Sequence, residues 1–343
     1  MRISIVLPVL NEATDIERLL LQVLDQEPPP GGFEILVADG GSSDGTRDIV
    51  RALAERHANL TLLENPARRS SAGRNAGAQA ATGDVVLFID GHCSLPRRDY
   101  LERVAALFAS TNADCLCRPQ PLSRLAGEGW GAAVAAARHS FLGHNAGSDI
   151  YAGKAGFTDP RSAGAAYRRA VWVDLGGYDE RFDACEDVEF NHRVAVAGLR
   201  SYVHPDLAVD YRPRSTPGGL LRQMVRYGRG RARLMAKYPG TAPLPLLVIT
   251  GVALAAILVL PFLGAVPVLA GLGALAGAWL LLVGIESVRG GRSWDERGRI
   301  AVAFTAIHLG LTAGFWRGIA EWRRFRRPAP ARKAGGEERR VPV

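Results

Sequence analysis

Acidic and amide side chains follow each of three apolar runs near the start of the sequence. In chain order, these side chains are Asn11 with Glu12, then Asp39, then Asp90. Short continuous apolar runs predict buried parallel strands, and open α/β sheets bind their ligands at the carboxyl ends of strands. A carboxylate such as Asp39 can accept hydrogen bonds there from a base or a sugar. We therefore predict that these side chains share a ligand site.

Strands that alternate with helices must position these side chains. The apolar runs cover residues 2–10, 33–38 and 84–89, and helical spacing follows the first two over residues 16–23 and 47–57. This alternation predicts an α/β fold with a sheet at its centre. Glycines in the loop after the second run would let the backbone approach a ligand closely.

The loop after the first run separates two kinds of nucleotide-binding protein. A Rossmann-type dehydrogenase needs Gly-x-Gly-x-x-Gly there, and that loop is absent. The motifs that stand in this sequence are Pro8-x-x-Asn11-Glu12, Asp39-Gly40-Gly41-Ser42-x-Asp44-Gly45-Thr46, Arg74-Asn75-x-Gly77, Gly83-Asp84, Asp90-x-His92, Glu186-Asp187 and Gln223-x-x-Arg226-Tyr227-Gly228. With these motifs, residues 1 to about 240 resemble the inverting glycosyltransferases of family 2. The sequence is most similar to the membrane-attached, succinoglycan-type glucosyltransferases of exopolysaccharide assembly.

The resemblance implies a fold and a reaction. The fold would be GT-A, the nucleotide-diphospho-sugar transferase fold with a Rossmann-like mixed sheet, followed here by a C-terminal helical membrane module. In the reaction, an acceptor hydroxyl would attack the anomeric carbon while the diphosphate leaves from the opposite face. Such a site needs a base for the hydroxyl, a cation for the diphosphate and a rigid grip on the nucleotide.

The resemblance also assigns roles to single residues. Asp187 would be the catalytic base and Glu186 would orient the acceptor, although the sequence alone does not order the two acids. Carboxylates at a helix start can also be caps or dipole partners. The residues expected to bind the nucleotide sugar are Pro8, Val9, Asn11, Glu12, Asp39, Arg74, Asp90, Gln223 and Arg226. The residues expected at the acceptor are Gly164, Glu186 and Tyr227.

The resemblance places a divalent cation at Asp90 and His92. At a strand end, side chains at i and i+2 point the same way, so both could reach one ion. The family usually has Asp at the second position, and imidazole suits Mn²⁺ better than Mg²⁺, which prefers oxygen ligands. We therefore expect Mn²⁺ to be favoured over Mg²⁺. The alternative is that His92 only caps the strand end.

The charge distribution and the cysteine content indicate which binding partners and which cellular compartment to expect. The 343 residues carry a net charge of +8, and basic residues crowd segments 212–237 and 317–333 next to apolar segments. This pattern favours an anionic membrane surface over nucleic acid, for which no binding module is visible. The four cysteines lack zinc-finger spacing and are too few for a disulfide scaffold. Reduced thiols in the cytosol are expected.

The C-terminal third predicts membrane attachment. Residues 244–263 and 265–285 are each long enough to cross ~30 Å of hydrocarbon, and the short link between them predicts a hairpin. Basic residues flank the pair on both sides, which places both flanks in the cytoplasm. A buried hairpin in a soluble domain is the alternative. Residues 300–316 form either a third span or an interfacial helix, and the interfacial helix is favoured because it keeps the Arg-rich tail cytoplasmic.

These features divide the chain and predict its function. We expect a GT-A domain over 1–212, a basic amphipathic segment over 213–240, a membrane module over 241–325 and a disordered basic tail over 326–343. No signal peptide is seen. We therefore expect a multi-pass protein of the inner (plasma) membrane whose catalytic domain is cytoplasmic. It would move one sugar, from UDP-glucose by the family default, to a lipid-linked saccharide or lipid acceptor.

Two alternative functions are weighed against this one. A processive polysaccharide synthase would carry Gln-x-x-Arg-Trp, whereas Tyr227 replaces the tryptophan here. A non-catalytic nucleotide-binding membrane scaffold is the second alternative. The presence of Asp39, Asp90 and Asp187 together argues against it.

Overall fold

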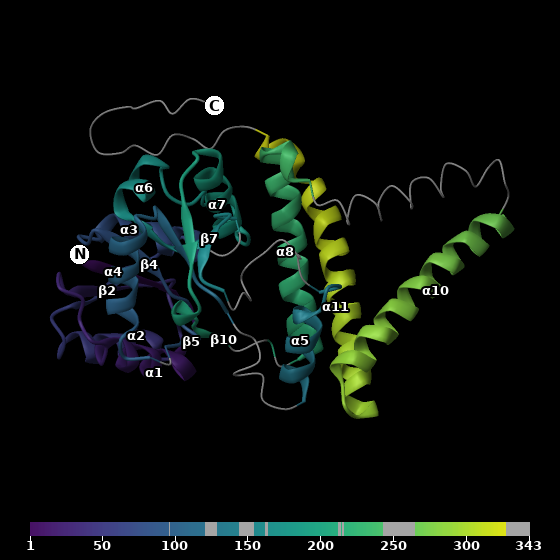
Figure 1. The fold of residues 1–343 in the computed structure, drawn as a ribbon, viewed down its shortest axis with the longest axis horizontal. Helices are drawn as coiled ribbons and strands as arrows, with labels where there is room; N and C mark the ends of the chain where they lie inside the picture. The colour runs from purple at the N-terminus through teal and green to yellow at the C-terminus, as the bar shows by residue number, and fades with distance from the viewer. Residues whose placement is uncertain are drawn as a thin grey trace.

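The computed structural model describes residues 1–95, 97–120, 129–143, 154–161, 164–211, 214, 216–242 and 265–326. A mixed α/β part lies beside a helical part, from which one long helix projects (Figure 1). The expected α/β fold with a C-terminal helical part is therefore present.

The central sheet is mixed and has eight strands in the order β3-β2-β1-β4-β8-β6-β9-β7. The bounds of these strands are β1 Ile3–Val9, β2 Phe33–Asp39, β3 Leu60–Glu64, β4 Val85–Phe88, β6 Cys115–Cys117, β7 Gly156–Thr158, β8 Gly164–Arg168 and β9 Ser201–Val203. A separate antiparallel pair joins β5 (Cys93–Ser94) to β10 (Asp210–Tyr211). β1 runs parallel to β2 and β4, and β8 runs antiparallel to β4.

Helices cover both faces of the sheet. Their bounds are α1 Ala13–Leu24, α2 Thr46–Ala54, α3 Ser70–Ala80, α4 Tyr100–Thr111, α5 Trp130–His139, α6 Arg169–Asp174, α7 Glu186–Val196, α8 Pro217–Lys237, α10 Ala265–Gly290, α11 Trp294–Ile319 and α12 Trp322–Phe325. Short 3-10 helices cover Pro205–Leu207 and Pro239–Thr241. The two helices predicted after the first two strands are α1 and α2.

The predicted apolar runs form the neighbouring strands β2, β1 and β4. Their side chains alternate between two cores because successive residues of a strand face opposite sides. Ile3, Ile5 and Leu7 of β1 pack with α1, α2 and α4. Val6 packs on the other face with α3, α6 and α7. Burial on both faces explains why these strands are mostly apolar and lack a regular alternation with polar residues.

The strand register brings several loops to one edge of the sheet. Val9 pairs with Asp39, and Val6 pairs with Phe88, so the chain leaves β1, β2 and β4 at the same edge. β8 runs the other way and begins at this edge, where Gly164 pairs with Cys117. The polar residues predicted to share a site therefore stand at one edge.

The helical part is built around a close contact between α8 and α11. Gly310, Gly314 and Gly318 are spaced four apart on α11 and face α8. A Cβ on Gly314 would lie 2.0 Å from the carbonyl oxygen of Val225, and one on Gly228 would lie 2.1 Å from that of Leu311. α5 packs against α11 as well, and their apolar side chains form a separate core with α8. α11 is thus part of the folded body and not an appended segment.

This contact predicts a pair of opposite stability effects. We expect Gly314→Ala to lower the free energy of unfolding by about 1–3 kcal/mol, because the added methyl overpacks the helix contact. Gly298→Ala on the same helix is the control, since a Cβ there meets nothing within 4 Å. It should stabilise the helix by about 0.5–1 kcal/mol through backbone entropy. Thermal unfolding of the full chain measures both, and equal effects would contradict the close packing.

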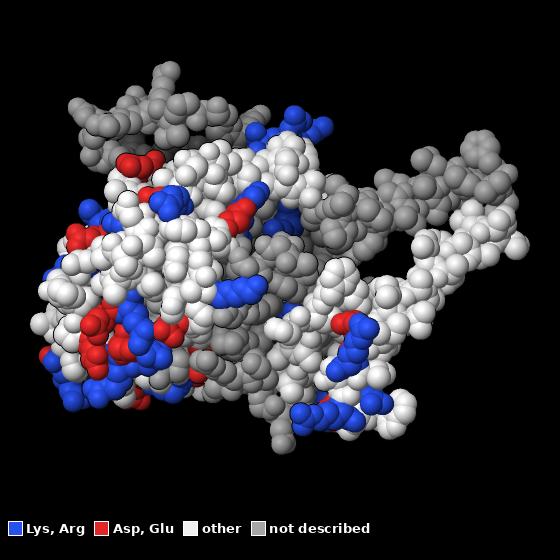
Figure 2. All heavy atoms as spheres, in the orientation of Figure 1, with Lys and Arg blue, Asp and Glu red and all other residues white. Residues whose placement is uncertain are grey.

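The apolar C-terminal segments are only partly within the described residues. Predicted span 244–263 and tail residues 327–343 lie outside them. Among the described residues, two helices are long and apolar enough to cross a membrane, Val266–Gly290 and Trp294–Ile319. The apolar stretch is 6% buried in the first helix and 44% buried in the second. The projecting shaft of α10 shows neither basic nor acidic side chains until its C-terminal end (Figure 2).

Candidate active site

The first two loops at the site edge are held together by hydrogen bonds. The backbone N of Asn11 donates to Ser42 Oγ at 2.9 Å, and Asn11 Oδ1 accepts from the backbone N of Ser43 at 2.9 Å. The backbone N of Glu12 donates to Thr46 Oγ1 at 2.9 Å. Asn11 has a φ of 57°, a left-handed conformation that Asn tolerates better than most residues. The motifs around Asn11 and Asp39 therefore form one connected surface.

Asp39 lies beneath this surface and has no exposed side-chain area. Its Oδ1 accepts from the backbone N atoms of Gly41 and Ser42, at 2.9 and 3.0 Å. Its Oδ2 accepts from Ser42 Oγ at 2.5 Å, and Arg47 Nη1 lies 3.6 Å from Oδ1. In this conformation Asp39 shapes the glycine loop. Direct contact between its carboxylate and a nucleotide base requires the loop to move. Pro8 is half-buried and Val9 is buried beside it.

Arg74 joins the centre of the site. It stands on α3 and its Nη2 donates to Asp90 Oδ1 at 2.6 Å, while its Nη1 donates to Glu186 Oε1 at 2.5 Å. The guanidinium also lies 5.6 Å from the ring centre of Tyr178. The Arg74 side chain is 12% exposed, so it is not a surface arginine. One side chain therefore brings together the motifs at residues 74, 90 and 186.

The surroundings of this bridge shift the pKa values of Asp90 and Glu186 in opposite directions. Burial opposes ionisation of Asp90, but the neighbouring Arg74 outweighs it and lowers the pKa of Asp90 to about 2. Burial raises the pKa of Glu186, with Asp187 adding to the shift and Arg74 opposing it. Asp90 is thus held as a carboxylate, as a cation site requires.

The two acids at the start of α7 face different surroundings. Glu186 is buried and binds Arg74, whereas Asp187 is exposed and its Oδ1 accepts from the backbone N of Val188 at 2.8 Å. Cys185 caps the helix with a φ of 62°, a conformation rare for a residue with a Cβ. The turn therefore separates a buried acid from an exposed one. Only the exposed acid is open to a hydroxyl from solution.

Asp90 and His92 do not lie on a strand. β4 ends at Phe88, and the backbone N of Cys93 donates to the carbonyl oxygen of Asp90 at 3.0 Å, which closes a turn. The strand argument for a shared direction was therefore wrong. The two side chains are still neighbours. Burial opposes protonation of His92, but its hydrogen bond to Glu12 and the charge of Asp90 raise its pKa.

The donor set fits a cation shared with a ligand. Within the described residues, no three His, Cys, Asp or Glu side chains are grouped as a metal site. His92 Nδ1 lies 3.1 Å from Glu12 Oε1, an arrangement common where histidine binds a metal through its other nitrogen. A carboxylate and an imidazole could hold an ion whose other ligands are diphosphate oxygens and water.

The Gln223–Tyr227 motif lies on α8, which packs against the turn before α7. Gln223 Nε2 donates to Tyr227 Oη at 3.5 Å. Arg226 Nη2 donates to the carbonyl oxygen of Asp183 at 2.5 Å. Arg226 therefore contacts the acid turn in this structure.

Gly164 has a packing reason for being glycine. A Cβ there would lie 2.4 Å from Asn191 Oδ1 and 2.8 Å from Tyr167 Oη. The described contacts explain the residue without an acceptor, and its predicted role at the acceptor stays a prediction.

Known proteins resemble this chain both in sequence and in fold. The model of the family "Glycosyl transferase family 2" matches residues 4–158. The succinoglycan biosynthesis protein ExoA of Rhizobium meliloti (strain 1021) is 34% identical over 330 residues, which cover 93% of this chain and 96% of that protein. This chain belongs to glycosyltransferase family 2.

A second relative and a solved structure also resemble this chain. The glycosyltransferase AglE of Haloferax volcanii is 29% identical over 234 residues, covering 68% of this chain and 73% of that protein. The mannosyltransferase PcManGT from Pyrobaculum calidifontis, solved with GDP-Man and Mn²⁺, matches with a TM-score of 0.59 at 22% identity. That match covers 90% of this chain and 87% of the solved one, and it shows a shared GT-A fold. The predicted family, fold and enzyme class are confirmed.

One residue of this glycosyltransferase site was missed in the sequence. Arg118 follows β6 at the same sheet edge, is 7% exposed, and donates from Nη1 to the carbonyl oxygen of Phe88 at 2.5 Å. Its charge helps to lower the pKa of Asp90. Its buried Nε has no hydrogen-bond partner among the described residues. The signal was a short strand ending in a basic residue, which the search for acids passed over.

Proposed function

We propose that this glycosyltransferase moves one sugar from a nucleotide-diphosphate sugar to a lipid-linked saccharide or lipid acceptor in exopolysaccharide assembly. UDP-glucose is the donor we propose first. The observation that carries the proposal is the Arg74 bridge, which brings the Asp90 loop and the Glu186–Asp187 turn into one site. A donor bound at the Asp90 loop and an acceptor bound at the Glu186–Asp187 turn would lie close enough to react.

On the donor side, the connected loops offer groups suited to a nucleotide. Asn11 and Glu12 stand at the surface of these loops, above the buried Asp39. Arg74 and Arg226 supply positive charge that suits a diphosphate. For Arg74 to contact a phosphate, the ligand must compete with the two carboxylates that it now binds. We propose that donor binding draws Arg74 away from Glu186.

On the acceptor side, we propose Asp187 as the general base. It is exposed, whereas Glu186 is buried and paired with Arg74. An exposed carboxylate can accept the hydroxyl proton on one oxygen while Oδ1 keeps its hydrogen bond from the backbone N of Val188. Tyr227 is 37% exposed on the neighbouring helix, a placement that suits stacking on a sugar.

A divalent cation at Asp90 and His92 would offset the charge of the departing diphosphate. The lowered pKa of Asp90 and the Glu12–His92 contact support this site. The mannosyltransferase from Pyrobaculum calidifontis, whose solved structure contains GDP-Man and Mn²⁺, adds a precedent for a cation in this fold. We propose Mn²⁺ over Mg²⁺ because one ligand is an imidazole.

The acceptor class rests on the helical part and on the relative's name. The projecting α10 is apolar along its shaft and almost wholly exposed, which water does not favour. ExoA of Rhizobium meliloti is described as a succinoglycan biosynthesis protein, which supports an exopolysaccharide context. We propose a multi-pass protein of the inner membrane whose catalytic domain is cytoplasmic and whose acceptor reaches the site from the bilayer.

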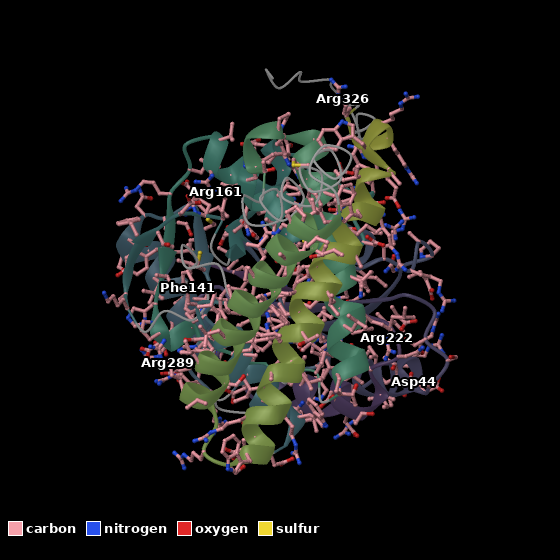
Figure 3. The ribbon with its side chains drawn as sticks, turned by 90° about the vertical axis from the view of Figure 1, so that its right-hand side faces the viewer. Asp44, Phe141, Arg161, Arg222, Arg289 and Arg326 are labelled. Carbon is pink, nitrogen blue, oxygen red and sulfur yellow. The ribbon has the colours of Figure 1, made fainter. Side chains whose placement is uncertain are left out.

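We propose that α11 lies in the membrane interface. Exposed apolar residues Val302, Leu309 and Trp316 recur every seven positions, on a different face from the glycines that contact α8. α10 and α11 both stand at the front of the view in Figure 3, so they line one side of the molecule. A helix packed on the catalytic part along one face is free to meet lipid along another.

Spin labels test this placement of α11. We expect labels on Val302→Cys, Leu309→Cys and Trp316→Cys to report the same shallow depth in bilayers, because an interfacial helix keeps all three near the headgroups. The four native cysteines are buried, so the introduced thiols should label selectively. A label at position 309 that lies far deeper than the other two would show that α11 crosses the bilayer.

A ligand screen tests the proposed function as a whole. Thermal unfolding of the full chain would be followed with UDP-, GDP- and dTDP-sugars in the presence of Mn²⁺. A ligand that binds only the folded state raises the unfolding temperature. We expect UDP-glucose to give the largest rise in unfolding temperature. We also expect the protein to transfer glucose from UDP-glucose to a lipid extract. A larger rise with a GDP- or dTDP-sugar would reject the proposed donor, and no rise with any of them would reject nucleotide-sugar binding.

A further inference from the structure

Four charged side chains connect the end of α11 to the loop before the acids. Arg229 Nε and Arg233 Nε donate to the two carboxylate oxygens of Glu321, each at 2.8 Å. Arg233 Nη1 also donates to Asp183 Oδ1, and Arg229 Nη1 lies 3.5 Å from Asp183 Oδ2. We call Asp183, Arg229, Arg233 and Glu321 the charge network. It joins α8, the residue that precedes α12, and the loop that leads into α7.

An aromatic contact fixes the same junction. Phe325 of α12 is 1% exposed and packs edge-on against Phe182, with ring centres 5.3 Å apart. The guanidinium of Arg233 lies 5.0 Å from the ring centre of Phe325. Two residues from the C-terminal end of the described chain therefore fix this loop. Phe325 packs directly on Phe182, and Glu321 is linked to Asp183 through Arg233.

The loop held in this way ends at the two acids. Asp183 stands three residues before Glu186, and Cys185 between them has a left-handed backbone. The backbone of this loop also rests on α8, because a Cβ on Gly230 would lie 2.7 Å from the carbonyl oxygen of Ala184. Only Ala184 and Cys185 separate Asp183 from Glu186. Because this segment is so short, we expect a shift of Asp183 to move Glu186 and Asp187 as well.

The charges in the network balance only when Glu321 is present. Arg233 is 4% exposed, and a buried guanidinium is costly unless it is paired. Two arginines face two carboxylates. Without Glu321, both arginines would compete for Asp183 and pull it from its present position.

We infer that Glu321 and Phe325 are positioning residues for the Glu186–Asp187 turn. They touch neither acid. They act through Asp183 and Phe182, so that transfer depends on the end of α11 being docked on α8. This inference rests on the proposed role of Asp187 and extends it to residues more than 130 positions away in the sequence.

The experiment compares Glu321→Gln with the wild-type full chain in lipid nanodiscs, using radiolabelled UDP-glucose and a polyprenyl diphosphate-linked sugar as acceptor. We expect kcat to fall about 10- to 100-fold, the scale of a misplaced catalytic group. The KM for UDP-glucose should change much less than kcat, because the donor loops at Asn11 and Asp39 are untouched and only Arg226 on the donor side contacts Asp183. Glu286→Gln is the matched control. It also removes a carboxylate from a helical ion pair, with Arg289 on α10, and should keep the wild-type kcat.

A double variant separates positioning from general loss of structure. If Glu321 acts through Asp187, Glu321→Gln should add little to the defect of Asp187→Asn. Phe325→Leu keeps the charge network and an apolar side chain, and should lower kcat less than Glu321→Gln does. It serves as the test if Glu321→Gln unfolds at the assay temperature.

The outcomes distinguish this inference from the proposed function. A wild-type kcat in Glu321→Gln, or in Phe325→Leu where the first variant unfolds, would overturn the positioning role. So would fully additive effects in the double variant. If Asp187→Asn itself transfers glucose normally, the proposed base is wrong. A loss in Glu321→Gln would then show that the junction serves a different group.

Discussion

Asp187→Asn should lower the rate of sugar transfer by about 10²–10⁴-fold, the usual cost of removing a general base. The substitution keeps the shape of the side chain and its acceptor oxygen toward the backbone N of Val188, so the turn should stay folded. Donor affinity should barely change, because the donor loops lie on the other side of the Arg74 bridge. Single-turnover transfer and direct donor binding, measured on the same protein, separate the two effects.

Glu186→Gln is the comparison that makes this result interpretable. Because Glu186 is predicted to orient the acceptor, we expect this variant to raise the acceptor KM more than it lowers kcat. The structure adds a second effect, because Glu186 binds Arg74 and Arg74 binds Asp90. We also expect tighter donor binding, because Arg74 would no longer have to leave the Glu186 carboxylate to reach the diphosphate. Intact transfer in Asp187→Asn, or loss of donor binding in that variant, would move the base assignment to Glu186.

The strands and their polar ends could be predicted because both are local properties of the sequence. The runs at 2–10, 33–38 and 84–89 are mostly apolar, as expected for strands covered on both faces. Asp39 and Asp90 follow from the rule that ligands bind at strand ends. The resemblance then supplied roles that spacing does not carry. The choice of Asp187 over Glu186 is the clearest example.

The contacts that organise the site could not be predicted because they join residues far apart in the sequence. Arg74 binds Glu186 across 112 positions, and nothing near Arg74 indicates that partner. The burial of Asp39 depends on how the glycine loop folds back over it. The chain turns at Asp90, directly after β4, so the rule that residues i and i+2 of a strand point the same way does not apply to Asp90 and His92. Nothing near Gly310, Gly314 and Gly318 in the sequence indicates α8 as their partner, and only the structure shows this contact.

Chelation of divalent cations should abolish transfer, and Mn²⁺ should restore it better than Mg²⁺. The expectation follows from the ligands available at the Asp90 loop. Asp90 offers a carboxylate whose pKa is lowered to about 2, and His92 offers an imidazole held by Glu12. A mixed nitrogen and oxygen set suits Mn²⁺, whereas Mg²⁺ prefers oxygen alone. Transfer is measured with excess EDTA and then with each metal added back.

His92→Asp should shift the preference toward Mg²⁺, because it replaces the nitrogen ligand with an oxygen ligand. Glu12→Gln keeps His92 in place but removes the charge of its partner, and changes of this kind typically cost about 10–100-fold in metal affinity. The two variants together separate a direct ligand from a histidine that only closes the turn. If both keep the wild-type metal preference and affinity, His92 is not a ligand. If transfer continues undiminished in excess EDTA, the charge of the leaving diphosphate must be offset by Arg74, Arg118 and Arg226 instead.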